Sequence, residues 1–395
     1  MQLFQALLLL SLVSALPAFP AAVLVLQFQN RSQYSDLNWV GESVAETLMN
    51  EYAEANQIVL DRSSRAEAMH RLSLRPGATF TKATLIRLGQ TLDADYLCYG
   101  TYEVTLPAGS SELKDSSVQL SARFLDLRHM HDGPETSETG KLSELSRLEE
   151  HLAFTTLKYL EPKANLALDH FIAPNKLIRV DAEESYVRGL LSPSGDQQQK
   201  WFLQAAALDP NFASPAFELG KLALQKKDYH QALAFFQRIN PSYPRYTEVR
   251  FKIGITDYYL ADYPSAISYF REVLKTYPLN EVYNNLGIAE LQLNQPAALG
   301  DLHRAVDGDP NDSIYLFNLG AALWKSGRFD EAAKALQSLL DRQPDDADAA
   351  ALLERAQTHE SPATAKPDIP ERLKLSFNAS AFRQLKALVE PKGSE

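Results

Sequence analysis

The sequence predicts a small α/β domain with a mixed sheet, followed by an all-α region of stacked helical hairpins. Two observations lead to this fold class. Residues 22–160 alternate between short apolar runs and amphipathic helical patterns. From about residue 180 onward, a pattern of Gly, Ala, Phe and Pro recurs with a spacing close to 34 residues.

The first region contains several runs with the composition of buried or half-buried strands, at 22–30, 57–60, 95–104 and 117–127. In the last run, Val118, Leu120 and Phe124 alternate with polar residues, as expected for a strand with one buried face. Between and after these runs, amphipathic patterns predict helices at 38–55, 81–94 and 143–160.

Particular stretches of this region resemble the TolB amino-terminal-domain-like family, which is akin to the CsgG and LpoB-type periplasmic domains. The resemblance rests on "VLVLQFQN" at 23–30, Gly41 with its helix, "RSS" at 62–64, "IRLGQTLDADYLCYGTY" at 86–102 and "LSARFLDL" at 120–127. It implies one α/β domain over residues 21–162. The sequence departs from the family in a polar hairpin loop at 106–117. It departs again at 131–140, where the family usually carries an aromatic strand.

The repeated pattern is clearest in residues 228–244, "DYHQALAFFQRINPSYP", and 262–278, "DYPSAISYFREVLKTYP". The residues that recur 34 positions later are Asp228, Tyr229, Ala232, Phe236 and Pro244. His230 is replaced by Pro264 in the second copy. Because the candidate proton carrier is lost while the packing residues are kept, the pattern indicates a structural unit and not a site.

The repeat anchors continue through the carboxyl-terminal half. Prolines recur at Pro210, Pro244, Pro278, Pro310 and Pro344, glycines at Gly220, Gly254, Gly287 and Gly320, and alanines at Ala232, Ala266, Ala298 and Ala332. The pattern resembles the tetratricopeptide repeat (TPR), which implies an α-solenoid of about five repeats over residues 180–356. Each repeat would be a helical hairpin that buries its apolar face only against its neighbours.

The end of the chain is predicted to return to the solenoid. Helix 346–356 would cap the stack, and the Pro-rich residues 357–370 would form a linker. Residues 371–390, within the terminal segment 371–395, have the pattern of an amphipathic helix with Leu373 and Phe377 on its apolar side. This helix could dock back on the repeats.

The TPR resemblance implies that a protein or peptide partner binds the concave face formed by the first helix of each repeat. The predicted partner-binding residues are Phe217, Lys221, Phe251, Tyr258, Tyr259, Asn284, Asn285, Phe317, Asn318, Trp324 and Lys325. In this family, Asn at the positions of Asn285 and Asn318 often bonds a peptide main chain. Glu218 and Lys252 stand there in the earlier repeats, so the clamp would be partial. Alternatively, many of these aromatic side chains simply pack between helices.

Residues 1–20 have the pattern of a signal peptide, because the apolar run from Ala6 to Val13 is followed by small residues and prolines. The run has no preceding Lys or Arg, which leaves a buried amino-terminal element as the alternative. We therefore expect a periplasmic or otherwise exported protein without an integral membrane segment after signal removal. Cys98 is the single cysteine, so an internal disulfide is excluded, and its apolar surroundings predict a buried thiol.

Several functions are disfavoured by composition and motifs. The net charge of −11 and the absence of a dense Lys/Arg run argue against nucleic-acid binding. No catalytic or phosphate-binding motif occurs, so neither an enzyme nor a cofactor is predicted. His129 and His131 would supply only two metal ligands, whereas a site needs three or four, so the interpretation is a solvated loop and no metal.

The resulting hypothesis is an exported bacterial interaction scaffold whose TPR groove binds a protein or peptide partner in the periplasm or cell envelope. Two alternatives remain open. The α/β domain could be a small-ligand receptor or an enzyme, with the repeats as an adaptor. The chain could instead be a cytoplasmic signalling regulator, because TolB-like and TPR halves are also joined in such proteins.

Overall fold

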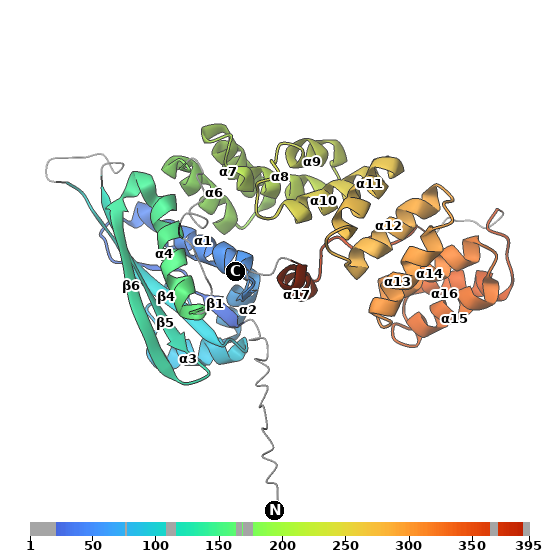
Figure 1. Cartoon of the computed structure of the whole chain (residues 1–395), viewed down its shortest axis with the longest axis horizontal. Helices are drawn as coiled ribbons and strands as arrows, with labels where there is room; N and C mark the ends of the chain where they lie inside the picture. Colours follow the sequence, from blue (N-terminus) through green and yellow to red (C-terminus); the bar gives the residue numbers. More distant parts are fainter. Residues whose placement is uncertain are drawn as a thin grey trace, which may run out of the picture.

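A computed structural model describes residues 21–75, 77–107, 116–162, 168, 177–363 and 370–389. Its first unit is an α/β domain, and its second is an array of helices that leads away from it (Figure 1). The predicted signal peptide at 1–20 and part of the predicted polar loop lie outside the described residues.

The α/β domain is built on one mixed sheet. Its strands are β1 (Ala22–Val25), β2 (Gln29–Asn30), β3 (Ile58–Leu60), β4 (Tyr96–Thr105), β5 (Ser117–Asp126) and β6 (His131–Lys141). The main strand order is β3-β1-β4-β5-β6, and β2 pairs with β4. The pairs among β1, β3 and β4 are parallel, whereas β5 and β6 add antiparallel hairpins at one edge.

Helices cover both faces of the sheet around β1, so this strand is apolar on both sides. Val23 and Val25 face the core beneath α1 (Val40–Glu54) and α4 (Leu145–Leu160). Leu24 and Leu26 face the opposite core, beneath α2 (Arg62–Arg71) and α3 (Lys82–Thr91). Short 3₁₀ turns, η1 (Ser35–Leu37) and η3 (Leu142–Glu144), precede α1 and α4.

Most predicted elements of this domain are present, with three differences. The run at 22–30 is divided into β1 and β2, because Leu26 N–H still donates to the Cys98 carbonyl of β4, whereas Phe28 N–H donates to the Gly41 carbonyl of α1. Residues 62–71 form α2, which the sequence pattern did not predict. Residues 131–141 form β6 although they lack aromatic side chains, since this edge strand is held by its main-chain ladder to β5.

Cys98 is fully buried on β4, as its apolar surroundings predict. Burial raises the pKa of its thiol to about 12, although the hydrogen bond with Tyr52 opposes this rise. The thiolate is therefore scarce at neutral pH, which agrees with a structural and not a nucleophilic cysteine.

The second unit consists of antiparallel helix pairs. The pairs are α6 (Val180–Leu191) with α7 (Gly195–Leu208), α8 (Ala213–Gln225) with α9 (Tyr229–Phe236), α10 (Tyr246–Tyr259) with α11 (Tyr263–Leu274), α12 (Asn280–Gln292) with α13 (Ala298–Gly308), and α14 (Ser313–Lys325) with α15 (Phe329–Leu340). Helix α16 (Ala347–Gln357) packs against the last pair. This arrangement confirms the predicted solenoid fold.

The predicted anchors explain how the paired helices approach each other. A Cβ atom added to Gly220 would lie 2.4 Å from the ring of Phe236, and one added to Gly254 would lie 2.7 Å from Phe270. Leu302 and Leu336 fill the same place against the later glycines. The anchor alanines are buried at the same crossings. The recurring pattern thus reflects a repeated contact, in which a glycine on one helix leaves space for a bulky side chain on the paired helix.

The carboxyl-terminal segment differs from the prediction. The expected helix at 371–390 is present only as α17 (Ala379–Val389), and residues 371–378 are neither helix nor strand. The helix starts late because side chains of the inner helices bind the main chain of the preceding residues. Figure 1 shows α17 inside the curve of the solenoid, between the repeats and the α/β domain.

Candidate peptide-binding groove

A groove runs along the inner helices α10, α12 and α14, and residues 371–378 lie in it. We call these residues the docked segment. They pass from the start of α16 toward α10, so their direction is opposite to that of the repeats. The groove is therefore occupied by a part of the same chain.

Two asparagines hold the main chain of the docked segment. Asn318 Nδ2 donates to the Arg372 carbonyl at 2.6 Å, and Arg372 N–H donates to Asn318 Oδ1 at 2.8 Å. Asn285 makes the same pair of bonds with Lys374, at 2.8 and 2.9 Å. Because alternate residues are clamped, the segment is extended, since every second peptide group of an extended chain points the same way.

Further polar contacts continue the clamp. Lys252 Nζ donates to the Leu375 carbonyl at 2.6 Å, and Glu281 Oε1 accepts from Asn378 N–H at 2.7 Å. Asn284 Nδ2 donates to the Arg372 carbonyl at 3.3 Å, and its own Oδ1 accepts from Asn318 at 2.8 Å. The buried amides thus position one another as well as the segment.

Charged side chains of the docked segment meet charges of the opposite sign. Arg372 forms a bidentate pair with Asp346, at 2.6 and 2.8 Å, and its guanidinium lies 3.6 Å from the ring centre of Phe317. Lys374 pairs with Asp312, and its ammonium lies 4.8 Å from the Tyr315 ring centre. Asp348 lies 3.4 Å from the Arg372 guanidinium. Each base therefore has at least one carboxylate and one aromatic face, a combination that favours a cation over a neutral side chain.

The two ends of the docked segment are held differently. At one end, Glu371 pairs with Lys325 and accepts a 2.9 Å hydrogen bond from Gln292. At the other end, the Phe377 ring packs on Phe251, with 4.4 Å between ring centres. Phe382 of α17 continues this aromatic contact to Tyr277 at 4.9 Å. The segment therefore has an acidic start, two bases and an aromatic end.

The surroundings of these groups change their proton affinities. The bidentate contact with Arg372 lowers the pKa of Asp346 despite the opposing effect of burial. Burial lowers the pKa of Lys252, an effect that the nearby Glu248 opposes. A buried lysine is costly unless it donates, so its bond to the Leu375 carbonyl compensates part of that cost.

Two family models match this half of the chain, both described as tetratricopeptide repeat, at residues 248–280 and 296–356. Together with the hairpin geometry, these matches decide the repeat type. The chain contains tetratricopeptide repeats. Both matches lie within the TPR solenoid, and no curated protein matches the chain.

Several solved structures are similar to the TPR solenoid. YrrB, described as a TPR protein with an unusual peptide-binding site, is 18% identical, with a TM-score of 0.39 over 45% of this chain and 92% of YrrB. MamA from Desulfovibrio magneticus RS-1 is 19% identical, with a TM-score of 0.39 over 43% and 99%. TTC0263, a TPR protein of Thermus thermophilus, is 16% identical, with a TM-score of 0.36 over 45% and 99%.

The structure brings together most of the residues predicted for the concave face. Those that contact the docked segment are Phe251, Tyr258, Asn284, Asn285, Phe317, Asn318 and Lys325. Asn285 and Asn318 bind a main chain, as the TPR resemblance implies. The bound chain is the protein's own carboxyl-terminal segment.

The remaining predicted residues lie elsewhere. Phe217 packs on Phe236 within its own repeat, and Lys221 pairs with Glu218 at 2.8 Å. Tyr259 stacks on Tyr229 with ring centres 4.7 Å apart. Trp324 donates through Nε1 to the Glu360 carbonyl at 3.0 Å, beyond the end of α16. Packing between neighbouring elements accounts for the three aromatic side chains, and the ion pair of Lys221 lies within α8 itself.

Sequence reasoning missed several groove residues, namely Lys252, Glu281, Asp312, Tyr315 and Asp346. In the sequence pattern, Lys252 is only a departure from the asparagines of the later repeats. Asp312 and Asp346 cap α14 and α16, respectively. Their spacing of 34 residues could have drawn attention to a row of carboxylates at the starts of the helices.

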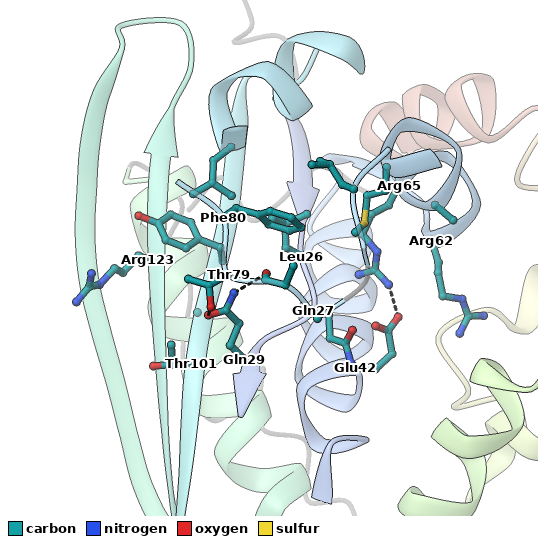
Figure 2. A pocket seen from close by; sticks show the side chains of 18 of the residues that line it. Leu26, Gln27, Gln29, Glu42, Arg62, Arg65, Thr79, Phe80, Thr101 and Arg123 are labelled. Carbon is teal, nitrogen blue, oxygen red and sulfur yellow. Dashed lines mark hydrogen bonds and ion pairs between the residues drawn. The ribbon is translucent and has the colours of Figure 1, made fainter. Parts of the chain in front are cut away.

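A separate cavity of about 730 Å³ lies in the α/β domain (Figure 2). Leu26, Phe80 and Leu85 form part of its apolar wall. Its charged lining is mainly basic, with Arg31, Arg62, Arg65, His70, Lys82 and Arg123 against the single acid Glu42. Glu42 is already paired with Arg65, in a contact that is buried. Arg62, Lys82 and Arg123 also form ion pairs, with Glu46, Asp132 and Glu135, so the positive charge of the lining is partly neutralised. The excess of bases that remains suits an anionic group better than a cation.

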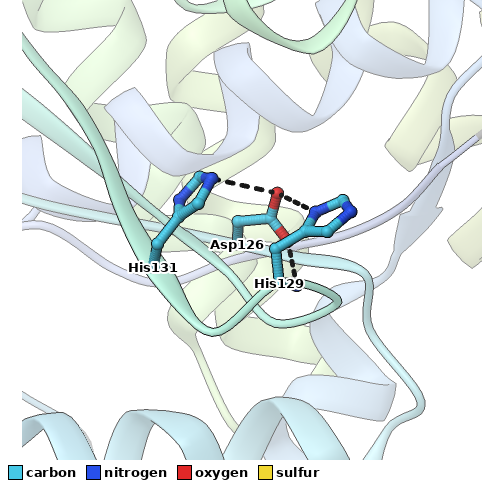
Figure 3. A group of neighbouring side chains, drawn as sticks. All are labelled: Asp126, His129 and His131. Atoms are coloured by element: carbon cyan, nitrogen blue, oxygen red, sulfur yellow. Dashed lines mark hydrogen bonds and ion pairs between the residues drawn. The ribbon is translucent and has the colours of Figure 1, made fainter.

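Asp126, His129 and His131 gather at the turn between β5 and β6, with one ligand-type atom of each within 4.8 Å of the others (Figure 3). The sequence interpretation had found no third ligand for the two histidines, and Asp126 supplies one. However, Asp126 Oδ1 accepts from the N–H groups of Arg128 and His129, and Oδ2 contacts His129 Nδ1 at 2.9 Å. The cluster is therefore explained as a cap of the turn, with both histidines exposed as predicted.

Among the helices in the described part of the chain, none combines the length and apolar character needed to cross a bilayer.

Proposed function

We propose that this chain is an exported bacterial interaction scaffold whose TPR groove binds an extended segment of a protein partner. TPR proteins are generally protein-interaction scaffolds. The observation that carries the proposal is the double hydrogen bond that Asn285 and Asn318 each make with one residue of an extended chain. This is recognition of main-chain groups, which any extended peptide offers.

The burial of the clamp supports a binding role. Asn284, Asn285 and Asn318 are fully buried, although amides are usually placed at surfaces. Such groups are tolerated when they are hydrogen-bonded, and the docked segment supplies part of their bonds. An apolar interior would stabilise the helices equally well without them. Their placement in successive repeats is therefore best explained by binding of an extended chain.

The location in the periplasm or cell envelope rests on the sequence. The apolar run at Ala6–Val13 has the length and following small residues of a signal peptide. The resemblance of residues 21–162 to the TolB amino-terminal-domain-like family supports the same compartment. Fractionation of the native producer, with amino-terminal sequencing of the purified protein, tests this part of the proposal. A cytoplasmic protein that retains residues 1–20 would support the signalling alternative.

The groove function is tested on the full chain after its own segment has been displaced. Arg372→Glu with Lys374→Glu places negative charges against Asp346 and Asp312 and leaves the groove unchanged. A labelled peptide of residues 370–379 is then titrated by fluorescence anisotropy. We expect saturable binding, which weakens by about tenfold or more when Asn285→Ala and Asn318→Ala are added.

The exposed residue Asn50, on α1, supplies the matched control, because Asn50→Ala removes the same side chain outside the solenoid helices that form the groove. Peptide binding by that variant should be unchanged. Absence of peptide binding to the displaced chain, with circular dichroism showing intact helices, would overturn the groove function.

The basic cavity favours one alternative, that the α/β domain is a receptor for a small anionic ligand. Its volume of about 730 Å³ is in the range of small-molecule sites, and most of its charged lining residues are basic. Thermal-shift titration with inorganic phosphate and with citrate tests this role. Stabilisation that is lost in Arg62→Ala would support it, and an equal shift in both proteins would reject it.

A further inference from the structure

We infer that the docked segment is an internal competitor of the partner. The partner then presents an extended segment with the order base, apolar residue, base, two further residues, aromatic residue. This inference deepens the proposed function and rests on it. It specifies which side chains the partner segment carries. It also states that the intact chain is self-occluded, which means that its own docked segment blocks the groove.

The docked segment has the properties of a ligand more than of a folded element. Residues 371–378 contribute no helix or strand of their own, and side chains of the groove bind the main chain at Arg372, Lys374, Leu375 and Asn378. Contacts of this kind stabilise a peptide of any sequence. The side chains therefore decide which extended segment is preferred.

Two neighbouring positions in the groove select bases. The first consists of Asp346, Asp348 and the Phe317 ring, and it holds Arg372. The second consists of Asp312 and the Tyr315 ring, and it holds Lys374. Acidic side chains at these positions would meet the carboxylates directly and would be rejected. The intervening Leu373 is 9% exposed, which indicates an apolar preference between the two bases.

A third position selects an aromatic ring. Phe377 stacks between Phe251 and Phe382, with centroid distances of 4.4 and 5.3 Å. Phe382 belongs to α17, so a partner lacking this helix would have its ring held by Phe251. Beside the segment lies a cavity of about 340 Å³, lined by the acids Glu281, Asp309 and Asp312 on the solenoid side and by Lys374 and Phe377 on the segment side. A partner with an additional basic group could therefore make contacts that the internal segment does not make.

Leu373 and Phe377 pack against the apolar core of the solenoid, but the charged contacts of the internal segment are weak enough to allow its displacement. Arg372 and Lys374 remain 25% and 22% exposed, and ion pairs that are partly exposed contribute little in water. Its advantage is its covalent attachment to the repeats, because a segment on a short tether has an effective concentration on the order of a millimolar. A partner must displace this segment before it can bind. The apparent Kd of the intact chain therefore equals the Kd of the open groove divided by the fraction of molecules whose groove is open.

Helix α17 connects the docked segment to the α/β domain. Phe382 packs on Tyr277 of the solenoid, and Lys386 pairs with Glu54 at the end of α1. Displacement of the segment therefore removes the anchor that precedes α17 and weakens its link between the two units. Partner binding would be transmitted to the α/β domain by this route.

The test measures binding of the labelled 370–379 peptide to two full-length proteins, the intact chain and the displaced chain carrying Arg372→Glu and Lys374→Glu. We expect the displaced chain to bind at least about tenfold more tightly, because its groove is open. Lys200→Glu with Lys334→Glu is the matched control, since it changes the same charge at exposed positions on α7 and α15. This control should bind like the intact chain.

A second peptide tests the partner chemistry. It carries glutamate in place of both bases, and we expect its binding to the displaced chain to be at least about tenfold weaker. Size-exclusion chromatography of the displaced chain should show the same mass as the intact chain, which excludes exchange of segments between two copies.

The outcomes separate the two levels of the proposal. Equal binding of the first peptide to the intact and displaced chains would reject self-occlusion while leaving the groove function in place. Equal binding of both peptides to the displaced chain would reject the selection of bases. Failure of the folded displaced chain to bind either peptide would reject the groove function itself. Should the double variant be unfolded, Phe377→Ala in the full chain is used in its place, with the same expectations.

Discussion

The side-chain amide of Asn318 and the main chain of Arg372 exchange two hydrogen bonds, of 2.6 and 2.8 Å. Asn285 repeats this arrangement with Lys374, one repeat earlier in the solenoid and two residues later in the docked segment. The match between one TPR repeat and two residues of extended chain is the structural basis of the groove. The docked segment therefore runs opposite to the order of the repeats.

This relationship predicts an alternating pattern of hydrogen exchange. The amides of Arg372, Lys374 and Asn378 donate to groove side chains, so they should exchange slowly. Asn318→Ala removes the acceptor for Arg372, and the loss of such a bond is worth about 1–3 kcal/mol. Exchange at Arg372 should then be faster by about fivefold to a hundredfold, as measured by NMR. Unchanged exchange at Arg372 would contradict the clamp, and Asn50→Ala should leave all three amides unaffected.

Stepwise charge reversal of the Lys325–Glu371 ion pair should first open the groove and then close it again. Glu371→Lys places two ammonium groups together and should increase peptide binding by favouring release of the docked segment. Adding Lys325→Glu restores opposite charges and should restore occlusion. We expect a coupling energy of about 0.5–3 kcal/mol between the two changes in a double-mutant cycle. Additive effects on peptide affinity would show that the pair does not hold the segment.

Two glycine substitutions should have opposite effects on stability. The Cβ atom of Gly220→Ala would lie 2.4 Å from the ring of Phe236, so this variant should lose about 1–3 kcal/mol through overpacking. Gly300 lies within α13, and a Cβ atom added there would meet no atom within 4 Å, so Gly300→Ala should gain about 0.5–1 kcal/mol from helix propensity. Urea denaturation followed by circular dichroism distinguishes them. A destabilised Gly300→Ala would contradict the open surroundings of this position.

The contact between the α/β domain and the first TPR hairpin should depend on pH. Burial and the charge of Glu183 raise the pKa of Glu149 well above its usual value, and burial raises the pKa of Glu183. Because both pKa values are higher in the folded protein, stability is fully present below the ordinary glutamate pKa of 4.5. It is lost as the pH rises through the folded-state values.

Glu149→Gln should therefore flatten this pH dependence, since the amide carries no charge and can still accept from Thr47. We expect a gain of about 1 kcal/mol in the free energy of unfolding at pH 8 and little change at pH 4. Glu103→Gln, at an exposed position on β4, is the control. Parallel stability curves for Glu149→Gln and the unmodified protein between pH 4 and 8 would refute the assignment.

The predictability of the two halves differs for a physical reason. The TPR hairpins are local structures whose packing is repeated. The contacts of Gly220 with Phe236 and of Gly254 with Phe270 therefore join residues at the same spacing, which can be recognised in the sequence. In the α/β domain, strands with apolar runs were found, whereas β6 was not predicted. That strand lies at an edge and is held mainly by its ladder to β5, so its side chains carry little of the information.

The sequence alone determined the order of the two units, the pairing of the TPR helices and the asparagines that face the groove. These features follow from apolar periodicity and repeated spacing, which are properties of neighbouring residues. Only the tertiary structure decided what lies in the groove. Asn318 and Arg372 are 54 residues apart, and their contact depends on the path of the whole chain. The same path turned the expected helix at 371–378 into an extended segment, because groove side chains bind its main chain better than a helical turn would.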